Sequence, residues 1–357
     1  MVDIIEIDPN DDAALRAFFD TERASIHQDR PDAVTRNWES IRTSARTPDR
    51  YYRRTFLAAV EEGRTVGTCE LGRSVEDNQH VADVEINVLG DHRRRGIGRL
   101  LWDEADDRRR RDERSTVCAD VHVPAGADPD DTSGYASARS VGFETVHVED
   151  HLMLRLPVSE ADLERLRAQV RGRAEGYDVV TWGNRCPGAY AAAYGAMKTQ
   201  MSTDVPVGEI DYQPIVYDEA RLRSQEERTA RSYDQLVAAA RRPDGAFAGY
   251  TQLFLSRDED DDAVIQDDTL VMPGHRGHRL GTILKLATLR IVQRDHPRRR
   301  SIHTWTDPEN HAMYRTNTDF GFQPVERLHE MQRKDADADG RLTAAGEVAQ
   351  LVRAEDS

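Results

Sequence analysis

The sequence predicts a mixed α/β protein built from two related halves, and three observations support this prediction. The 357 residues are too many for a typical single domain and suit two domains. A strand, a basic glycine-containing turn and a helix follow one another in this order in each half. A Gly-Phe pair follows each of these units downstream. The repetition of both landmarks indicates an old internal duplication.

The repeated unit begins with a strand pattern. Residues 81–89 alternate between apolar and polar side chains, as in a half-buried strand, and residues 263–272 form the second predicted strand. After a short turn, residues 93–98 read RRRGIG and lead into a helical pattern. Residues 276–281 read RGHRLG and lead into the second predicted helix. The two units keep the same order of elements although their sequences differ.

A tyrosine stands seven residues before each Gly-Phe pair. Tyr135 precedes the pair at 142–143, and Tyr314 precedes the pair at 321–322. The two arginine motifs are 183 residues apart, and the two Gly-Phe pairs are 179 residues apart. These nearly equal offsets indicate that both landmarks belong to one repeated unit.

Domain boundaries follow from the repeat and from the charged tract between the halves. We expect a first domain over residues 1–158, a linker helix over 159–176, a second domain over 177–333 and a polar tail over 334–357. Residues 189–201 and 218–240 have helical patterns and predict helices at the start of the second domain. Residues 344–354 predict a short helix in the tail.

Charge and hydropathy exclude several classes of protein. The net charge of −16 disfavours nucleic-acid binding, because phosphate contacts require a positive field. No run of 18 apolar residues occurs and the N-terminus lacks a signal-peptide pattern, so we expect a cytoplasmic protein without a membrane partner. The three cysteines form no CxxC pair, so we expect neither a disulfide framework nor a metal site.

The basic turn before each helix has the chemistry of a phosphate-binding loop. The first turn of a helix leaves its N–H groups without partners inside the helix, and the helix dipole attracts anions. Gly96 and Gly98 let the backbone approach a phosphate closely, and the arginines at 93–95 add positive charge. Arginine runs are also common on solvated surfaces, so the spacing alone leaves both interpretations open.

These residues resemble the coenzyme A loop of the GNAT superfamily of acetyltransferases. The family pattern Arg-x-x-Gly-x-Gly is matched by Arg93, Gly96 and Gly98, whereas the second copy has an arginine at the first glycine position. Residues 310–322 resemble the family's following helix, which ends in Gly-Phe. The resemblance covers residues 3–155 and 177–330, and the plan is similar to the tandem GNAT enzymes, of which mycothiol synthase is one.

The hairpin that precedes this loop in the family also has counterparts here. Residues 55–62 and 65–73 resemble it in the first half, and residues 245–250 and 252–256 resemble it in the second. The resemblance implies that each half has a central, mostly antiparallel sheet, flanked by helices and splayed open beside the loop. It also implies acetyl-CoA as the acyl donor and direct transfer of the acyl group to an acceptor.

The resemblance further implies which residues bind the cofactor. In the first half they are Val88, Arg93, Arg94, Arg95, Gly96, Ile97, Gly98 and Arg99. In the second half they are Val271, Arg276, Gly277, His278, Arg279, Leu280, Gly281, Thr282 and Asn310.

Acyl transfer to an amine requires a general base that takes a proton from the ammonium group. Glu85 and Asp268 each stand eight residues before the motif arginine, on a predicted strand, and are the candidate bases. Each also fits an outward-facing carboxylate on a half-exposed strand, and the neighbouring Asp267 is an alternative to Asp268.

The departing thiolate also needs an acid. The resemblance places a tyrosine four residues before Gly-Phe, where this chain has Ala138 and Asn317. Tyr135 and Tyr314 stand about one helical turn earlier and are the candidate acids. Packed core tyrosines, with water as the acid, are the alternative.

We therefore expect an acetyl-CoA-dependent N-acetyltransferase, monomeric or homodimeric, that acts on a small amine. The acidic composition favours a cationic acceptor. The better-formed downstream helix favours the second half as the catalytic one. The alternative is a degenerate regulatory or scaffold protein that only binds coenzyme A, which the missing tyrosines favour and the intact Gly96 and Gly98 oppose.

Overall fold

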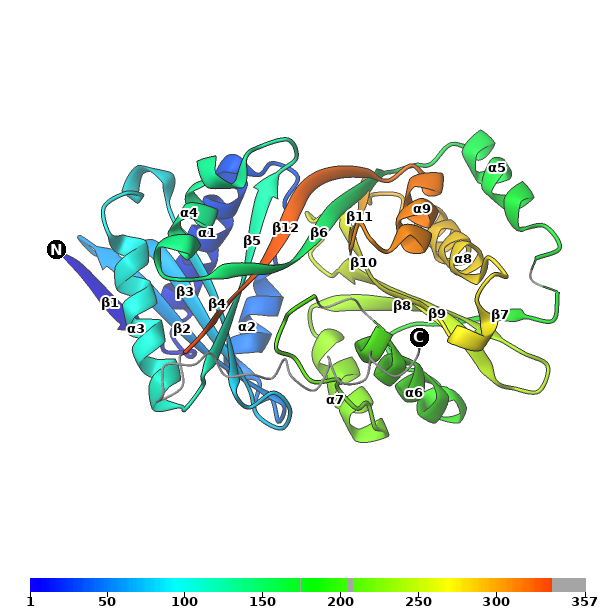
Figure 1. The fold of residues 1–357 in the computed structure, drawn as a ribbon, viewed down its shortest axis with the longest axis horizontal. Coiled ribbons are helices and arrows are strands. Elements are labelled where there is room, and N and C mark those ends of the chain that lie inside the picture. Colours follow the sequence, from blue (N-terminus) through cyan, green and yellow to red (C-terminus); the bar gives the residue numbers. More distant parts are fainter. Residues whose placement is uncertain (174, 205–207, 336–357) are drawn as a thin grey trace, which may run out of the picture.

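In the computed structural model, which describes residues 1–173, 175–204 and 208–335, one continuous sheet runs through the whole molecule. Its strands lie in the order β1-β2-β3-β4-β5-β12-β6-β11-β10-β9-β8-β7, with helices on both faces (Figure 1). The predicted mixed α/β fold with a mostly antiparallel sheet is confirmed. None of the described helices is long and apolar enough to cross a membrane.

The first half contains six strands and four helices. The strands are β1 (Val2–Glu6), β2 (Tyr52–Glu61), β3 (Arg64–Ser74), β4 (Val81–Val88), β5 (Thr116–Pro124) and β6 (Glu144–Arg155). The helices are α1 (Asp12–Asp29), α2 (Trp38–Arg46), α3 (Ile97–Arg111) and α4 (Ser133–Ser140).

The second half repeats this order after helix α5 (Glu160–Val170), which lies in the predicted linker. Its strands are β7 (Asp178–Trp182), β8 (Tyr233–Arg241), β9 (Phe247–Ser256), β10 (Ala263–Val271), β11 (Ser301–Thr306) and β12 (Gln323–Lys334). Its helices are α6 (Gly188–Asp204), α7 (Glu219–Thr229), α8 (Leu280–Asp295) and α9 (His311–Phe320).

The two faces of the sheet are covered by different helices. On one face, which we call the α1 face, α1 and α2 pack on β2 through residues such as Phe18, Ile41 and Phe56, while α6 and α7 pack on β8 to β10. On the other, which we call the α3 face, α3 and α4 cover the first half and α5, α8 and α9 cover the second. Alternation along each strand therefore sends neighbouring side chains to opposite layers.

Each half has a pair of parallel strands that separates part of the way along. β4 pairs with β5 only from Val81 to Asp83, and β10 pairs with β11 only from Ala263 to Ile265. Beyond these residues, β4 and β10 each have one edge without a strand partner among the described residues. The splayed arrangement that the resemblance implied is present in both halves.

The two halves exchange their last strands. β12, from the second half, lies between β5 and β6, and β6, from the first half, pairs with β11 (Figure 1). Each half of the sheet is thus completed by a strand from the other. The boundaries at 158 and 177 stay a prediction, and the exchange means that a cut there would divide the hydrogen-bonded partners β5 and β12.

One sequence-based expectation in the second half was wrong. Residues 218–240 were expected to be helical, but α7 ends at Thr229 and β8 begins at Tyr233. The run of alanines at 238–240 favours a helix locally. In the structure the small side chains of Ala238 and Ala240 face α8 and let its leucines pack closely on the sheet, whereas Ala239 faces α6. Tertiary packing therefore overrides local propensity.

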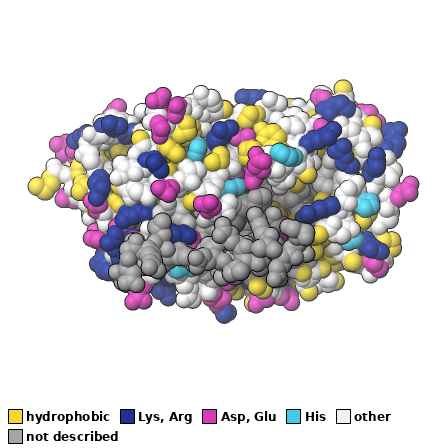
Figure 2. Space-filling view, viewed as in Figure 1, with side chains coloured by type: hydrophobic (Ala, Val, Ile, Leu, Met, Phe, Trp, Pro, Cys, Tyr) yellow, Lys and Arg dark blue, Asp and Glu magenta, His cyan; other side chains and the backbone are white. Residues whose placement is uncertain are grey.

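The expected second hairpin also differs, because residues 245–256 contribute a single strand, β9, whose hairpin partner is β8. The tail helix expected at 344–354 lies outside the described residues. On the face shown in Figure 2, acidic and basic side chains are interspersed, without one large surface of a single charge.

Candidate functional site

A cavity of about 1420 Å³ lies in the first half, where β4 and β5 separate. Its walls come from α1, β4, the loop before α3, α4, β5 and β12, with Glu85, Gly96, Asp120 and Glu330 among the lining residues. Ligand sites typically measure about 300–1,000 Å³. This cavity therefore has room for more than one bound molecule.

The loop at the mouth of this cavity leaves the N-terminus of α3 open. Gly96, the residue before the helix, has φ 82°, and no described side chain caps the first helical turn. A Cβ atom added at Gly96 would meet nothing within 4 Å, and one at Gly98 would lie 3.9 Å from its nearest neighbours. The exposed N–H groups and the helix dipole fit the pyrophosphate of coenzyme A.

Arg93 holds the loop in place. Its Nε donates to the Val88 carbonyl oxygen at 3.0 Å, and its guanidinium pairs with the Asp29 carboxylate and donates to the Ser25 carbonyl oxygen at 3.2 Å. These contacts fix the turn against the C-terminal end of α1. Arg93 therefore positions the loop, and its charge is already matched by a carboxylate.

Arg94 is the arginine of this run that stays available to an anion. Arg95 pairs with Glu61 at 2.6 Å, and Arg99 pairs with Asp103 at 2.7 Å. Arg94 has φ 60°, lines the cavity and is exposed, and it makes no ion pair within the part of the chain that the structure describes. Its guanidinium is free to approach a phosphate.

The second loop repeats this backbone shape. Gly277 and Arg279 have φ 86° and 56°, in the places where Arg94 and Gly96 have φ 60° and 82°. Arg276 copies Arg93, since its Nε donates to the Val271 carbonyl oxygen at 3.3 Å and its guanidinium pairs with Asp204 at 2.8 Å. Arginine in place of the first glycine therefore leaves the turn intact.

The cleft behind the second loop, however, is bridged by side chains. Buried Lys285 of α8 donates to the Asn317 amide oxygen of α9 at 2.6 Å, and Asn317 donates in turn to Thr306 at 2.9 Å. Arg279 pairs with Asp319 at 3.5 Å, which links the start of α8 to α9. These contacts join α8 to α9 across the region that a cofactor arm would enter.

The corresponding positions of the first half line its cavity. The repeat offsets match Arg279 and Lys285 to Gly96 and Trp102, and they match Asn317 and Asp319 to Ala138 and Ser140. All four first-half residues lie on the cavity wall, and Gly96, Ala138 and Ser140 have no charged side chain that could bridge it. The cavity therefore lies in the first half, whereas the sequence favoured the second half as the catalytic one. Helix α9, on which that preference rested, carries the residues that close the second cleft.

The remaining second-half residues chosen from the sequence have structural partners. Leu280 and Thr282 are buried, and Val271 packs beside Leu280. The Nδ1 atom of His278 lies 3.2 Å from a backbone carbonyl oxygen of its own turn. Asn310 caps α9, where its side-chain oxygen accepts from the Met313 N–H. None of these contacts points to a second cofactor site.

The two candidate bases differ in their surroundings. Glu85 is exposed on the cavity wall, and its only hydrogen-bond partner among the described residues is the Asn87 amide, at 3.1 Å. Asp268 accepts from buried Lys198 at 2.8 Å and from the Tyr250 hydroxyl at 2.6 Å. Glu85 is thus free to take a proton, whereas the charge of Asp268 is already matched.

Neither tyrosine proposed as an acid lines the cavity. The Tyr135 hydroxyl lies 3.1 Å from Thr145 Oγ1, and its ring packs on His329 in the core of the α3 face. The Tyr314 hydroxyl donates to Asp150 at 3.1 Å, and burial and this carboxylate raise its pKa. Both fit the alternative of packed core tyrosines.

Two other tyrosines, which the sequence did not single out, do line the cavity. The hydroxyls of Tyr52 and Tyr212 both donate to Asp83, one to each carboxylate oxygen. Burial and the adjacent carboxylate raise the pKa of both. Tyr212 comes from the segment between α6 and α7, so the second half completes the wall of the first. No local motif marks such a residue.

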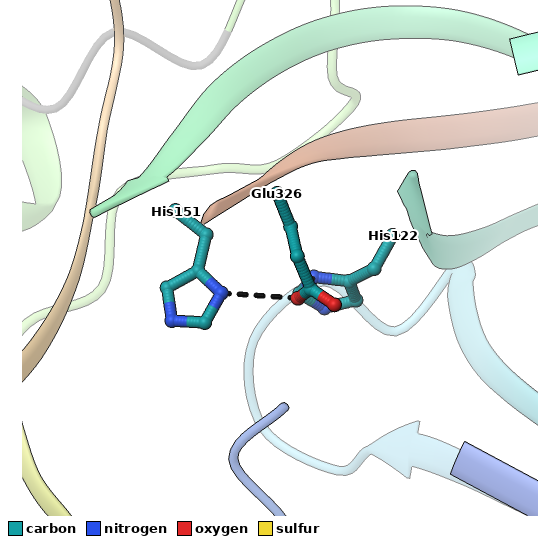
Figure 3. A group of neighbouring side chains, drawn as sticks. All are labelled: His122, His151 and Glu326. Atoms are coloured by element: carbon teal, nitrogen blue, oxygen red, sulfur yellow. Dashed lines mark hydrogen bonds and ion pairs between the residues drawn. The ribbon is translucent and has the colours of Figure 1, made fainter. Parts of the chain in front are cut away.

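A cluster of His122, His151 and Glu326 lies beside the cavity, on β5, β6 and β12 (Figure 3). Ligand atoms of the three residues lie within 4.8 Å of one another, which is the spacing of a metal site. Arg30, however, donates to both Glu326 oxygens, at 2.7 and 2.9 Å. A divalent cation would meet this guanidinium, so the residues fit an ionic link between α1 and the exchanged strands better than a metal.

Comparisons with known proteins agree with this geometry. Residues 13–125 match the acetyltransferase (GNAT) family, and this segment contains β4, the basic loop and most of the cavity wall. A comparison with curated proteins gave no match.

Solved structures show the same fold. A tandem GNAT protein from the clavulanic acid biosynthesis pathway is 26% identical, with a TM-score of 0.77 over 94% of this chain and 98% of that one. A GCN5-related N-acetyltransferase from Sphaerobacter thermophilus is 13% identical, with a TM-score of 0.62 over 93% of this chain and 95% of that one. Residues 13–125 are therefore an acetyltransferase (GNAT) family domain, and the fold of the whole chain is similar to that of a tandem GNAT protein.

Proposed function

We propose that the protein is an acetyl-CoA-dependent N-acetyltransferase in which the first half alone binds the acyl donor. The observation that carries this proposal is the contrast between the two clefts. The first opens into a cavity of about 1420 Å³, whereas Lys285 and Asn317 bridge the second. The GNAT match over residues 13–125 supports acetyl transfer as the chemistry.

The residues present fit the pyrophosphate and the pantetheine arm of the donor. The N–H groups at the start of α3 and the Arg94 guanidinium hold the pyrophosphate. Within the part of the chain that the structure describes, the edge of β4 beyond Asp83 has no strand partner, so its backbone groups pair with the amides of the pantetheine arm. Acetyl-CoA supplies an activated acyl group.

Transfer is direct in this proposal. The acceptor arrives as an ammonium group and gives a proton to Glu85, and its nitrogen then bonds to the thioester carbon as the C–S bond breaks. The two tyrosines on the described cavity wall donate to Asp83, so the second proton of the attacking nitrogen passes through water to the departing thiolate. The products are the N-acetylated amine and free coenzyme A.

The walls of the cavity favour a cationic acceptor. Arg36 pairs with Glu22 and Glu70, at 2.9 and 2.6 Å, and Arg54 also pairs with Glu70, at 3.0 Å. Glu85 and Asp120 also line the cavity, and neither has a Lys or Arg partner among the described residues. Carboxylates without such partners attract an ammonium group into the site.

Calorimetric titration with acetyl-CoA tests this proposal on the wild type, Gly98→Glu and Gly281→Glu. Both glycines have room for a Cβ, with nearest neighbours at 3.9 and 3.8 Å, so the two variants are matched. Glutamate at Gly98 places negative charge at the pyrophosphate position and is expected to weaken binding at least 100-fold. Gly281→Glu is expected to bind as the wild type does. Loss in the second variant alone would overturn the assignment.

A second candidate is a regulatory or scaffold protein that binds coenzyme A without turnover. It is favoured by one observation, that neither Tyr135 nor Tyr314 reaches the cavity. Thiol release from acetyl-CoA in the presence of amines separates the two functions. An enzyme releases thiol in proportion to amine, whereas a scaffold binds acetyl-CoA without release.

A further inference from the structure

Four carboxylates gather on the α1 face where the exchanged strands meet. Asp120 of β5 lies directly opposite Glu330 of β12, and Glu330 lies opposite His147 of β6. Glu149 follows two residues along β6, and Asp307 follows the end of β11. We call these five residues the acidic patch.

The charges in the acidic patch are not balanced by basic side chains. Within the described residues, no Lys or Arg pairs with any of its carboxylates, and like charges on facing strand positions repel one another. Burial, and then the neighbouring carboxylates, raise the pKa of Asp120 to about 6, that of Glu149 to about 7 and that of Glu330 to about 8. Glu330 therefore binds a proton at neutral pH in the free protein, and an ammonium group beside the patch would replace this proton and keep the carboxylates ionised.

His147 gives a second, independent indication of a ligand. Its side chain is only 9% exposed, and its Nε2 atom has no hydrogen-bond partner among the described residues. This nitrogen lies 3.8 Å from both the Asp307 and the Glu330 carboxylate, so it points into the patch at more than hydrogen-bond distance. A buried polar atom without a partner is unfavourable. An ammonium group would donate to this nitrogen and to the carboxylates together.

The patch continues from the proposed acetylation site. Asp120 and Glu330 line the same cavity as Glu85. Neighbouring strands lie about 4.8 Å apart, so the patch extends about 10 Å from β5 across β12 to β6. A linear molecule with one amine at Glu85 can therefore place a second charge on the patch. The patch carboxylates do not form a group that could hold a metal ion among the described residues.

We propose that the acidic patch binds a second ammonium group of the acceptor, so that the substrate is a diamine or polyamine. This inference rests on the proposed acetyltransferase function for the first amine. The exchanged strand β12 then has a role in specificity, because Glu330 comes from the second half of the chain.

Steady-state kinetics with two matched amines test the proposal. 1,7-Diaminoheptane carries two charges and 1-aminoheptane one, and both have the same chain length. We expect the wild type to favour the diamine at least 10-fold in kcat/KM. Glu330→Gln is expected to lose most of this preference through a higher KM for the diamine, with little change for the monoamine. Glu144→Gln, an exposed carboxylate on β6, is the control and keeps the preference.

Thermal unfolding without acetyl-CoA separates this inference from the function on which it rests. The diamine is expected to raise the Tm of the wild type more than the monoamine does, and to lose this advantage in Glu330→Gln. Equal stabilisation by both amines, or an equal effect of Mg²⁺ at the same ionic strength, would overturn the second-charge site. Failure of acetyl-CoA binding would instead reject the enzyme and leave these unfolding results unchanged.

Discussion

The two halves share a backbone and differ in what their side chains do at the cleft. Both loops place two left-handed residues before a helix, and both parallel strand pairs separate after three residues. In the first half the cleft is open, and Glu85 faces it freely. In the second half, Lys285 and Asn317 bridge the cleft, and Lys198 matches the charge of Asp268. Duplication has kept the scaffold, and a few substitutions decide which copy can bind.

The difference also concerns where unmatched polar groups lie. The open half keeps carboxylates without cationic partners, as binding sites often do at the expense of stability. In the bridged half, Asp268 pairs with Lys198, and Lys285 donates to Asn317, so these buried polar groups have partners within the protein. A comparison of matched variants in the two halves therefore separates function from stability.

The largest expected effect comes from separating the halves. Residues 1–158 and 159–357, each expressed alone, are expected to bind no acetyl-CoA, because β12 is missing beside β5 in the first fragment. Calorimetry on each fragment and on the co-expressed pair measures this, and the pair is expected to regain binding. Binding by the first fragment alone, at wild-type affinity, would show that β6 can take the place of β12.

The second largest effect is expected from substitutions of the two candidate bases, Glu85 of β4 and Asp268 of β10. Glu85→Gln is expected to lower kcat by about 10²–10⁴-fold, the usual contribution of a general base, with little loss of stability. Asp268→Asn is expected to keep its activity but to lower the free energy of unfolding by about 3 kcal/mol, because buried Lys198 loses its counter-charge. Urea unfolding and initial rates measure both. The reverse pattern would assign catalysis to the second half.

A smaller effect tests the bridge in the second half. Burial lowers the pKa of Lys285 to about 7 from its ordinary value of 10.5. The folded protein thus holds this proton less tightly than the unfolded chain, and the resulting destabilisation is full below pH 7 and vanishes above about pH 10.5. Lys285→Met is expected to raise the free energy of unfolding more at pH 6 than at pH 10. Arg290→Met, exposed on the same helix, is the control and shows no such trend.

The smallest effect concerns the acidic patch. Burial raises the pKa of Glu330 to about 8 from 4.5, so the folded state binds the proton more tightly than the unfolded chain. The stability from this proton is present below pH 4.5 and is lost as pH rises through 8. Glu330→Gln is therefore expected to gain a few degrees in Tm over the wild type at pH 9 and much less at pH 5. A difference that is flat with pH, as expected for Glu144→Gln, would contradict this assignment.

Much of the first half could be predicted from the sequence because its signals are local. The strand before Arg93, the glycines that open α3 and the position of Glu85 all depend on residues close together in the chain. The tandem fold was also predictable, because the repeat gives two landmarks at nearly the same offset.

The strand exchange could not be predicted, because β6 and β12 are equivalent in the repeat and the pattern does not say which of them pairs with β5. The closure of the second cleft also could not be predicted from the sequence. Lys285 and Asn317 stand 32 residues apart, and only packing of α8 against α9 shows that they meet. Tyr212 likewise reaches Asp83 across the two halves. The sequence therefore favoured the second half as the catalytic one, although the helix that suggested this, α9, closes the cleft of that half.

The strand exchange also determines when the cavity can form during translation. The wall of the cavity in the first half needs β12, which is translated about 180 residues after β6. At roughly 5–20 residues per second, this delay is on the order of 10–35 s. During that time the edge of β5 is not paired with β12, and the nascent first half has no complete acceptor site. The acceptor site can therefore form only after β12 has been synthesised.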